Sequence, residues 1–338
     1  MNNSNLKSLL STIKNQVGTA KDSKALIDCI KMAKDYGHPL KFDFKIHYFL
    51  MFLSFVLFVG MLFLINQQSG SVDNIYIGLT VFFAIGAITP LILILISNSS
   101  ISDINSSIFN KDSLFDNNLE IIKDDHEVFQ YLSDNFKNEF SRGNYSRKFL
   151  GGLCKKNDDN NLFLYRFKYT NSRTETYTST DSKGNTSIRT RTVYDDYYRY
   201  GALLDFGYAK SIEIKSYGSR LNPVSYSPAS MLFSDTFKLG GVDDISVSKF
   251  LKPAVVIAIE DLSKKLDNLN IEIDSNGKIC FSCYNSSLVD ISSSRKFGIE
   301  DPDNFMAEIS GETEFNKLES ILECFQNLKT HNDKNFTI

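Results

Sequence analysis

Long uninterrupted runs of apolar residues are the dominant pattern along this chain. Two runs, Ile46 to Ile65 and Ile75 to Ile96, contain no charged residue and hold 14 Leu, Ile, Phe or Val residues each. A helix rises about 1.5 Å per residue, so each run is long enough to cross a hydrocarbon core of about 30 Å. Helices buried in soluble proteins rarely stay apolar on every face over such a length. The pattern therefore predicts a transmembrane hairpin over residues 46–96.

Lysine residues precede the first run but are missing between the two runs. Residues 1–45 hold eight Lys, no Arg and four Asp, whereas residues 66–74 carry Asp73 as their single charge. The positive-inside rule places residues 1–45 in the cytoplasm, and two crossings return the rest of the chain to that side. We therefore expect a multi-pass protein of the bacterial inner membrane with both termini in the cytoplasm.

Residues 1–45 show an amphipathic helical period. Apolar residues from Leu6 to Ala20 recur at spacings of three and four while lysines mark another face, and the pattern resumes at Leu26 and stops at Gly37-His38-Pro39. Three interpretations stay open for this cytoplasmic segment. It forms a helix packed on the soluble domain, a helix on the inner leaflet with its lysines near anionic headgroups, or a disordered segment.

The remaining sequence mixes helical and strand periods. Residues 97–113 are rich in Ser and Asn and are interpreted as a linker, and Leu114 to Phe140 predicts one helix. From Leu162 the apolar period changes to two, which predicts strands. A polar turn at residues 181–185 lies between two alternating stretches, so we expect a long hairpin whose tip projects from the domain.

Further elements follow after residue 200. Residues 200–208 and 210–215 predict strands, residues 253–269 a helix, and residues 314–329 a closing helix. Asn276-Gly277 between two alternating runs is a strong hairpin signal. The order predicts an α+β fold: a two-helix transmembrane hairpin, then a cytoplasmic domain over residues 114–330 with a mostly antiparallel sheet and flanking helices. Residues 331–338 form a tail.

Two stretches of the soluble region resemble a known family. The segment YRYGALLDF, Tyr198 to Phe206, is similar to an aromatic-Gly-apolar-Asp-Phe strand that follows a basic hairpin. The segment FSDTFKL, Phe233 to Leu239, followed by Lys249 to Pro253, is similar to a paired-Phe strand leading into an amphipathic helix. Both features resemble the domain-of-unknown-function 3137 family, uncharacterised bacterial two-span membrane proteins. Val247-Ser248 stand where that family more usually has an Arg.

The resemblance spans about residues 40–330 and implies a membrane-complex partner, because family members often accompany LemA-like membrane proteins. It supplies no catalytic residue.

The residues that usually carry chemistry are scattered. Cys280 and Cys283 have CxxC spacing, yet there is no second CxxC or paired His, and strand alternation sends the two thiols to opposite faces. We interpret them as structural thiols. The five cysteines are an odd number on the predicted reducing side of the membrane. The four histidines give no evident general base, and no glycine-rich phosphate loop occurs. We therefore predict no enzyme activity, no metal and no cofactor.

The one charged surface that stands out is the long hairpin. Residues 162–191 hold six basic residues against Glu175 and Asp181. The candidate contact residues for a partner or a headgroup are Arg166, Lys168, Arg173, Arg189 and Arg191. Contact with anionic headgroups or an acidic partner would suit this surface, but so would a solvated hairpin whose charges prevent edge pairing. Nucleic acid is a weaker alternative, since no RNA-binding motif occurs.

Two functions agree with these patterns. The first is a membrane-anchored scaffold or interaction protein that presents its cytoplasmic domain to a protein partner, with a homo-oligomer also possible. The second is a membrane-perturbing effector of a stress or antiphage response that acts through oligomerised transmembrane helices. Small residues such as Gly60, Gly78 and Gly86 would let such helices approach closely.

Overall fold

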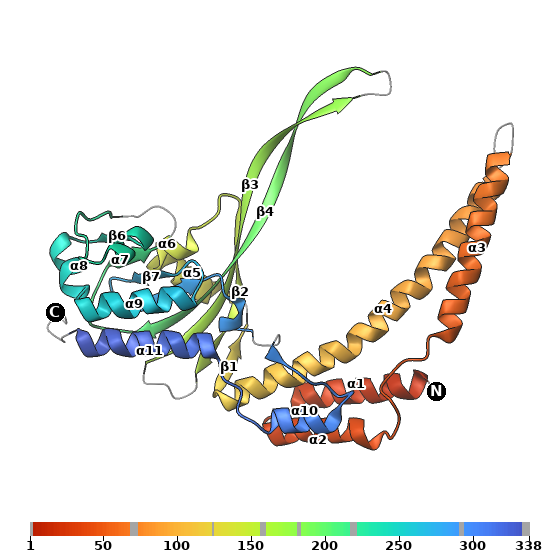
Figure 1. Ribbon diagram of the computed structural model, residues 1–338, viewed down its shortest axis with the longest axis horizontal. Helices are drawn as coiled ribbons and strands as arrows, with labels where there is room; N and C mark the ends of the chain where they lie inside the picture. Colours follow the sequence, from red (N-terminus) through yellow and green to blue (C-terminus); the bar gives the residue numbers. More distant parts are fainter. Residues whose placement is uncertain are drawn as a thin grey trace. The chain divides into compact units, whose positions relative to one another are not determined.

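The chain folds into two units, and each is described separately. The computed structural model describes residues 3–67, 74–123, 125–155, 160–180, 184–216, 222–290 and 294–332. Unit 1 comprises residues 1–115 and 294–313, and unit 2 comprises residues 116–293 and 314–338. The fold is α+β, with a pair of long apolar helices followed by an antiparallel sheet with helices (Figure 1), which confirms the predicted fold class.

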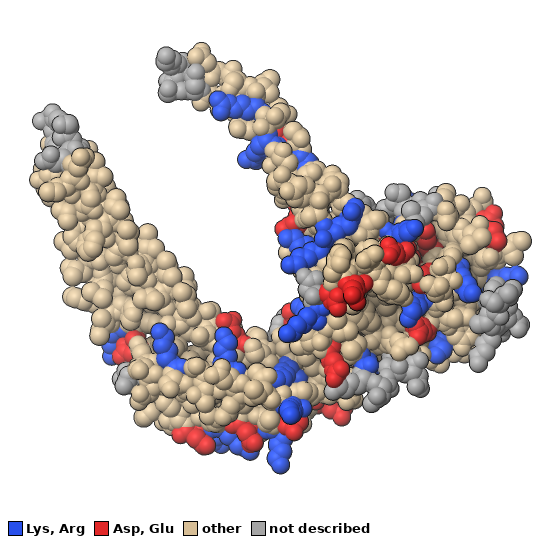
Figure 2. Space-filling view, turned by 180° about the vertical axis from the view of Figure 1, so that it is seen from behind, with Lys and Arg blue, Asp and Glu red and all other residues tan. Residues whose placement is uncertain are grey.

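Unit 1 contains the two apolar runs as two long helices. These are α3 (Lys45–Gln67) and α4 (Asn74–Asp116), and the most apolar 18 residues of each have a mean hydropathy of 2.6. Helix α3, all of whose residues are described, buries none of them in protein, unlike the core helix of a soluble domain. In Figure 2 these helices form a tan surface over most of their length, with Lys, Arg, Asp and Glu near the base. Both helices are long and apolar enough to cross a membrane.

The predicted linker at residues 97–113 is wrong, because α4 continues through it to Asp116. Ser and Asn dominate the composition of this stretch and favour turns. The same stretch also contains Ile101, Ile104 and Ile108. Their spacing of three and four places them on one helix face, and all three are buried. Burial of that face overrides the low helix propensity of the polar residues between them.

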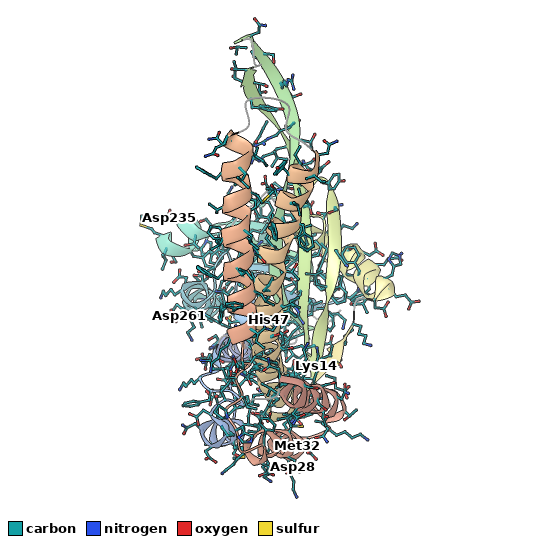
Figure 3. All side chains as sticks on the ribbon, turned by 90° about the vertical axis from the view of Figure 1, so that its right-hand side faces the viewer. Lys14, Asp28, Met32, His47, Asp235 and Asp261 are labelled. Atoms are coloured by element: carbon teal, nitrogen blue, oxygen red, sulfur yellow. The ribbon has the colours of Figure 1, made fainter. Side chains whose placement is uncertain are left out.

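The N-terminal segment forms two helices, α1 (Asn3–Thr19) and α2 (Ser23–Asp35), that belong to unit 1. Their apolar stripes are buried, whereas Lys14 and Asp28 on the polar faces are exposed (Figure 3). The Lys111 ammonium of α4 donates to the carbonyls of Val17 and Gly18, at 2.8 and 2.9 Å, and so caps the last turn of α1. The helical expectation is confirmed for these residues, and their apolar stripes are buried within unit 1; packing on the predicted domain over residues 114–330 and contact with the inner leaflet stay predictions.

The predicted domain boundary at residues 114–330 is also wrong, because residues 294–313 return to unit 1. Buried Asn105 on α4 holds this segment: its Oδ1 accepts the Ile299 amide at 2.9 Å, and its Nδ2 donates to the Glu300 carboxylate at 2.7 Å. Helix α10 (Pro302–Ile309) then contacts α2. A contact made by one asparagine across almost 200 residues leaves no periodic signal in the sequence.

Unit 2 is built on an eight-stranded antiparallel sheet with the strand order β1-β2-β3-β4-β8-β7-β5-β6. Its strands are β1 (Leu119–Ile122), β2 (Ser146–Lys155), β3 (Phe163–Thr180), β4 (Thr186–Asp205), β5 (Ile212–Lys215), β6 (Lys238–Gly241), β7 (Asn270–Ile273) and β8 (Lys278–Cys283). The predicted hairpin at Asn276-Gly277 joins β7 and β8. Gly277 adopts a φ of +82°, a conformation that favours glycine.

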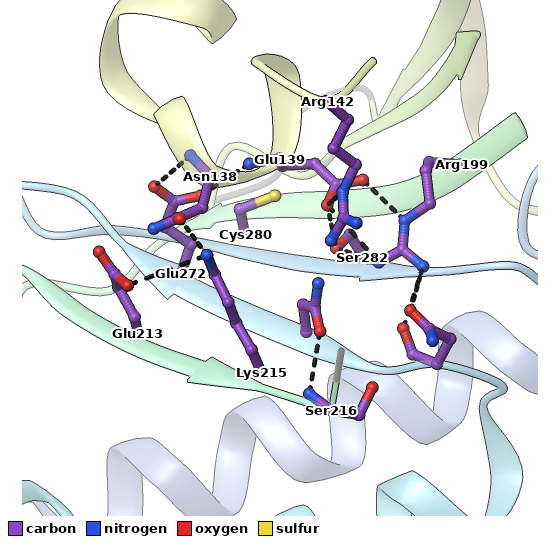
Figure 4. A network of polar contacts seen from close by, with 12 residues as sticks. Asn138, Glu139, Arg142, Arg199, Glu213, Lys215, Ser216, Glu272, Cys280 and Ser282 are labelled. Carbon is purple, nitrogen blue, oxygen red and sulfur yellow. Dashed lines mark hydrogen bonds and ion pairs between the residues drawn. The ribbon is translucent and has the colours of Figure 1, made fainter. Parts of the chain in front are cut away.

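Helices cover both faces of this sheet (Figures 1 and 4). On one face, α5 (His126–Asn135) and α6 (Lys137–Phe140) lie over an aromatic cluster that includes Phe149, Tyr165 and Phe167. On the other face lie α9 (Pro253–Lys265) and α11 (Asn316–His331), which contact each other. Two short helices, α7 (Met231–Thr236) and α8 (Asp244–Phe250), flank β6, and η1 (Ser286–Leu288) follows β8.

Two local expectations fail in unit 2. Residues 114–140 are not one helix, since Asn118 takes a left-handed φ of +52°, β1 follows it, and Asp125 caps the new helix α5 through the Glu127 amide. The expected paired-Phe strand at residues 233–239 begins instead as α7, capped by Ser230. Most of the predicted tail, residues 333–338, lies outside the described residues.

Candidate interaction site

Strands β3 and β4 continue well past the rest of the sheet. They pair from Phe163 opposite Leu203 to Thr180 opposite Thr186, whereas β2 stops opposite Thr170 and β8 stops opposite Tyr200. Residues 171–180 and 186–195 therefore form a two-stranded segment, which we call the ribbon (Figure 1), and the outer edge of β4 has no strand partner among the described residues down to Arg199. The predicted long hairpin is confirmed, whereas residues 181–183 of its predicted tip lie outside the described residues.

The ribbon has two chemically different faces, because alternate residues of a strand point to opposite sides. One face, called the charged face, carries Arg173, Glu175, Tyr177, Arg189, Arg191 and Asp195. The other, called the threonine face, carries Thr174, Thr176, Thr178, Thr180, Thr186, Thr190 and Thr192, with Thr174 opposite Thr192 and Thr176 opposite Thr190. Cross-strand threonine pairs stabilise such a ribbon modestly.

The five predicted contact residues do not form one surface. The alternation brings Arg173, Arg189 and Arg191 together on the charged face, but it sends Arg166 and Lys168 to the other side of the sheet. The Arg166 Nε atom is buried without a hydrogen-bond partner. The Lys168 ammonium lies 2.7 Å from the Asp196 carboxylate, which raises the pKa of Lys168.

The basic charge of the ribbon is largely neutralised within it. Arg173 contacts Glu175 at 2.5 Å and Asp195 at 2.7 Å, and Arg191 contacts Glu175 at 2.9 Å. Hydrogen bonds from the two arginines lower the pKa of Glu175. Among the described residues of the ribbon, Arg189 is the arginine for which no ion pair is found. The predicted basic stretch ended at Arg191 and therefore left out the acidic residues that follow it.

A second charged cluster lies under α6 at the base of the ribbon (Figure 4), and the sequence did not reveal it. The Glu139 carboxylate of α6 accepts from Arg199 Nε at 2.9 Å, Arg142 Nε at 3.0 Å and Ser282 Oγ at 2.9 Å. The Arg199 side chain is fully buried and also donates to the carbonyl and side chain of Asn268 at 3.0 and 2.9 Å. Burial alone would raise the pKa of Glu139, but the two guanidinium groups hold it below its usual value.

The same cluster continues along β5 and β7. Glu272 accepts the backbone amides of Asn138 and Glu139 at 3.2 and 3.3 Å, and it pairs in register with Glu213. Burial raises the pKa of Glu272 to about 8, with help from the charges of Glu139 and Glu213 and against the amide hydrogen bond. Lys215 hydrogen-bonds to the Asn138 side chain, and burial lowers its pKa.

Alternation explains why these charges were missed. In β5 the sequence Ile-Glu-Ile-Lys is buried at every position, so Glu213 and Lys215 look like the solvent side of an ordinary amphipathic strand. They lie instead under α6, on the sheet face that α5 and α6 cover. No sequence spacing indicates which face of a strand receives a covering helix.

Unit 2 also carries an apolar surface pocket of about 400 Å³ beside α5. Ile122, Val128, Tyr131, Phe163 and Leu203 are among its lining residues. Lys278 at its margin is paired with Asp205 at 2.6 Å. The lining of the pocket is mostly apolar, with Glu127, Asn161 and Lys278 as its polar residues, which suits an apolar group.

No family model, curated protein or solved structure matches this chain. The function must therefore be argued from the geometry described above.

The described residues contain no group of three His, Cys, Asp or Glu side chains placed to hold a metal ion. All five cysteines are described and are free thiols. Cys280 and Cys283 are buried on opposite faces of β8, and burial raises the pKa of Cys283 to about 11. Both thiols therefore stay protonated near neutral pH, which makes them poor nucleophiles.

Proposed function

We propose that this protein is a membrane-anchored interaction protein: α3 and α4 hold it in the bacterial inner membrane, and unit 2 presents the ribbon to a protein partner in the cytoplasm. The observation that carries the proposal is the ribbon itself. It is long, exposed and paired with no third strand among the described residues. The resemblance to the 3137 family points to a LemA-like membrane protein as one such partner.

The membrane half of this proposal rests on α3 and the first part of α4. Their side chains are mostly exposed and apolar, including Phe52, Phe63, Phe82 and Leu95. Exposure of so many large apolar side chains to water would be strongly unfavourable at about 25 cal/mol per Å². A bilayer removes that penalty, and the lysine-rich segment before α3 favours a cytoplasmic N-terminus.

The interaction half rests on the energetics of a two-stranded ribbon. An isolated pair of strands is marginally stable in water, and ordering each residue costs about 1–2 kcal/mol of backbone entropy. The aromatic cluster of unit 2 includes no described residue of the ribbon. A partner that pairs with or packs on the ribbon would offset that cost. Its nearly balanced charge favours a protein contact over simple attraction to anionic headgroups.

The test is affinity purification of the intact protein in mild detergent with mass spectrometry. The purification is compared with that of a short-ribbon variant, in which Asn-Gly replaces residues 175–191. Because Thr174 lies opposite Thr192, a two-residue turn closes a shorter hairpin without changing the register. We expect a stoichiometric protein with the full-length ribbon and its loss from the short-ribbon variant. Equal recovery from both proteins, or no stoichiometric protein from either, would count against the proposal.

A membrane-perturbing effector remains the second candidate function. Its support is that a Cβ atom added to Gly60 on α3 or to Gly78 on α4 would meet no other atom within 4 Å, so both positions leave space for another helix. Overexpression that leaves membrane potential and growth unchanged would remove this alternative.

A further inference from the structure

One edge of the ribbon is open and the other is partly covered. On the β3 side, the side chain of Asn144 accepts the Ser172 amide at 2.7 Å and donates to the Ser172 carbonyl at 3.1 Å. On the β4 side, no strand pairs with residues 186–199 apart from β3 in the part of the chain that is described. The edge of β4 therefore offers a row of backbone donors and acceptors to an incoming strand.

The charges on β4 restrict which incoming strand fits this edge. Suppose that a second copy of β4 pairs antiparallel with this edge around a two-fold axis. The residue on the axis then lies opposite the same residue of the other copy, and this determines all the other cross-strand pairs. Axes at Arg189, Thr190 or Arg191 place one arginine directly opposite another, which is destabilising. An axis at Thr192 instead places Arg189 opposite Asp195 of the second copy, twice per dimer.

The length of the open edge selects the same alignment. With the axis at Thr192, Thr186 at the far end of one ribbon lies opposite Tyr198 at the base of the other. An axis one residue further, at Val193, would place Thr186 opposite Tyr200, whose outer edge already pairs with Cys283 of β8. The Val193 alignment also avoids facing arginines, because it places Arg191 opposite Asp195, but it extends beyond the free edge. Of the two, the Thr192 alignment is the one that lets β4 pair from Thr186 onward within the free edge, up to Tyr198.

We propose that the protein forms a symmetric dimer in which the two β4 edges pair antiparallel about Thr192, giving a four-stranded sheet from two ribbons. The charged faces then form one side of that sheet and the threonine faces the other, because opposite residues share a face. Arg189, for which no ion pair is found among the described residues of its own ribbon, gains Asp195 of the second copy. This inference rests on the proposed role of the ribbon as an interaction element and names a second copy as its partner.

Cysteine cross-linking in native membranes tests the alignment directly. In the dimer, two Thr192→Cys side chains face each other with Cβ atoms about 4.5–5.5 Å apart, close enough for a disulfide under mild oxidation. The matched control is Thr174→Cys, which lies on the same face opposite Thr192 but on β3. Its two copies are three strand spacings apart, about 14 Å, and cannot bond. The unsubstituted protein measures the background from the five native thiols.

A charge exchange makes the test specific. In the Thr192→Cys background, we expect Arg189→Glu alone or Asp195→Arg alone to weaken the dimer about tenfold, from two altered charge pairs. Co-expression of the two variants restores opposite charges at both pairs, so the mixed dimer should cross-link as well as the parent protein. Each variant alone should not.

The outcomes separate this inference from the proposed function. Cross-linking at residue 192 but not at residue 174, with rescue only in the mixed dimer, supports the two-fold pairing. Absence of the residue 192 cross-link, or equal cross-linking at residue 174, overturns it. If the short-ribbon variant still loses a different stoichiometric protein in that case, the interaction role stands and the second copy is the wrong partner.

Discussion

The buried pair Glu139–Arg199 gives the sharpest prediction for stability. The two side chains are 3% and 0% exposed, and Nε lies 2.9 Å from the carboxylate. Glu139→Gln keeps the shape of the side chain but leaves the Arg199 guanidinium buried without its counter-charge. Breaking a buried pair in this way costs about 3–5 kcal/mol, a large share of a domain stability of about 5–15 kcal/mol. Arg142, the other guanidinium on this carboxylate, is 12% exposed and loses the same counter-charge.

Hydrogen exchange followed by mass spectrometry on the intact protein in detergent measures this loss locally. One tenfold change in an opening equilibrium corresponds to about 1.4 kcal/mol, so peptides from β4 and β8 should exchange about 100-fold to 3,000-fold faster in Glu139→Gln. The double variant Glu139→Gln with Arg199→Met removes both charges and should recover most of the protection. The exposed pair Asp261–Lys264 on α9 supplies the control, because Asp261→Asn should change little.

A change below about fivefold in Glu139→Gln would refute the reasoning, since it would mean that water replaces the counter-charge at this site. Failure of the double variant to recover would also refute it, because the loss would then come from packing and not from an unpaired charge.

Three further predictions follow from the structure. Glu272 has a folded pKa of about 8 against a usual value of 4.5, so its proton stabilises the fold below pH 4.5 and this contribution is lost as pH rises to about 8. Relative to wild type, the free energy of unfolding of Glu272→Gln should therefore increase across that range and differ by a constant amount above it. Chemical unfolding at a series of pH values measures this difference, and a difference independent of pH would contradict the assignment. A Cβ at Gly86 would lie 3.0 Å from the Ser54 hydroxyl oxygen, whereas one at Gly78 would meet nothing, so Gly86→Leu should lower the melting temperature in detergent by several degrees and Gly78→Leu should not. Asn105→Ala removes two hydrogen bonds to residues 299 and 300, at about 1–3 kcal/mol for the unsatisfied groups, and should raise hydrogen exchange in residues 296–309 while β4 stays protected.

The parts of the fold that were predictable are those with a regular period. The apolar runs of α3 and α4, the alternation of β3 and the Asn276-Gly277 turn each repeat a local physical rule over several residues. The linker predicted over residues 97–113 was wrong, because it rested on the Ser- and Asn-rich composition and not on the three isoleucines at helical spacing. The return of residues 294–313 to unit 1 was not predicted, because it depends on the side chain of Asn105. No local sequence pattern encodes such a distant contact.

The candidate site divides in the same way. The alternating stretches around residues 181–185 correctly predicted a long hairpin, but its basic charge was overestimated because Asp195 and Asp196 follow the stretch that was counted. The sequence did not predict the pairing of Arg199 with Glu139, because the two residues are 60 positions apart and each resembles an ordinary surface charge. Their burial depends on which face of the sheet α6 covers, and that is a property of the assembled fold.

The buried charges and the ribbon are connected through the position of Arg199. It is the last residue of β4 before β8 begins to pair with that strand, so it lies where the free outer edge of β4 ends, below the ribbon. Its guanidinium contacts Glu139 on α6, Asn268 in the loop before β7 and Ser282 on β8, and it lies 4.7 Å from the centre of the Tyr284 ring. A side chain held by three separate segments fixes the direction of the strand at that point. In the proposed dimer, an edge can select one register with a second copy only if its base does not shift, so this buried charge would support the proposed pairing as well as stability.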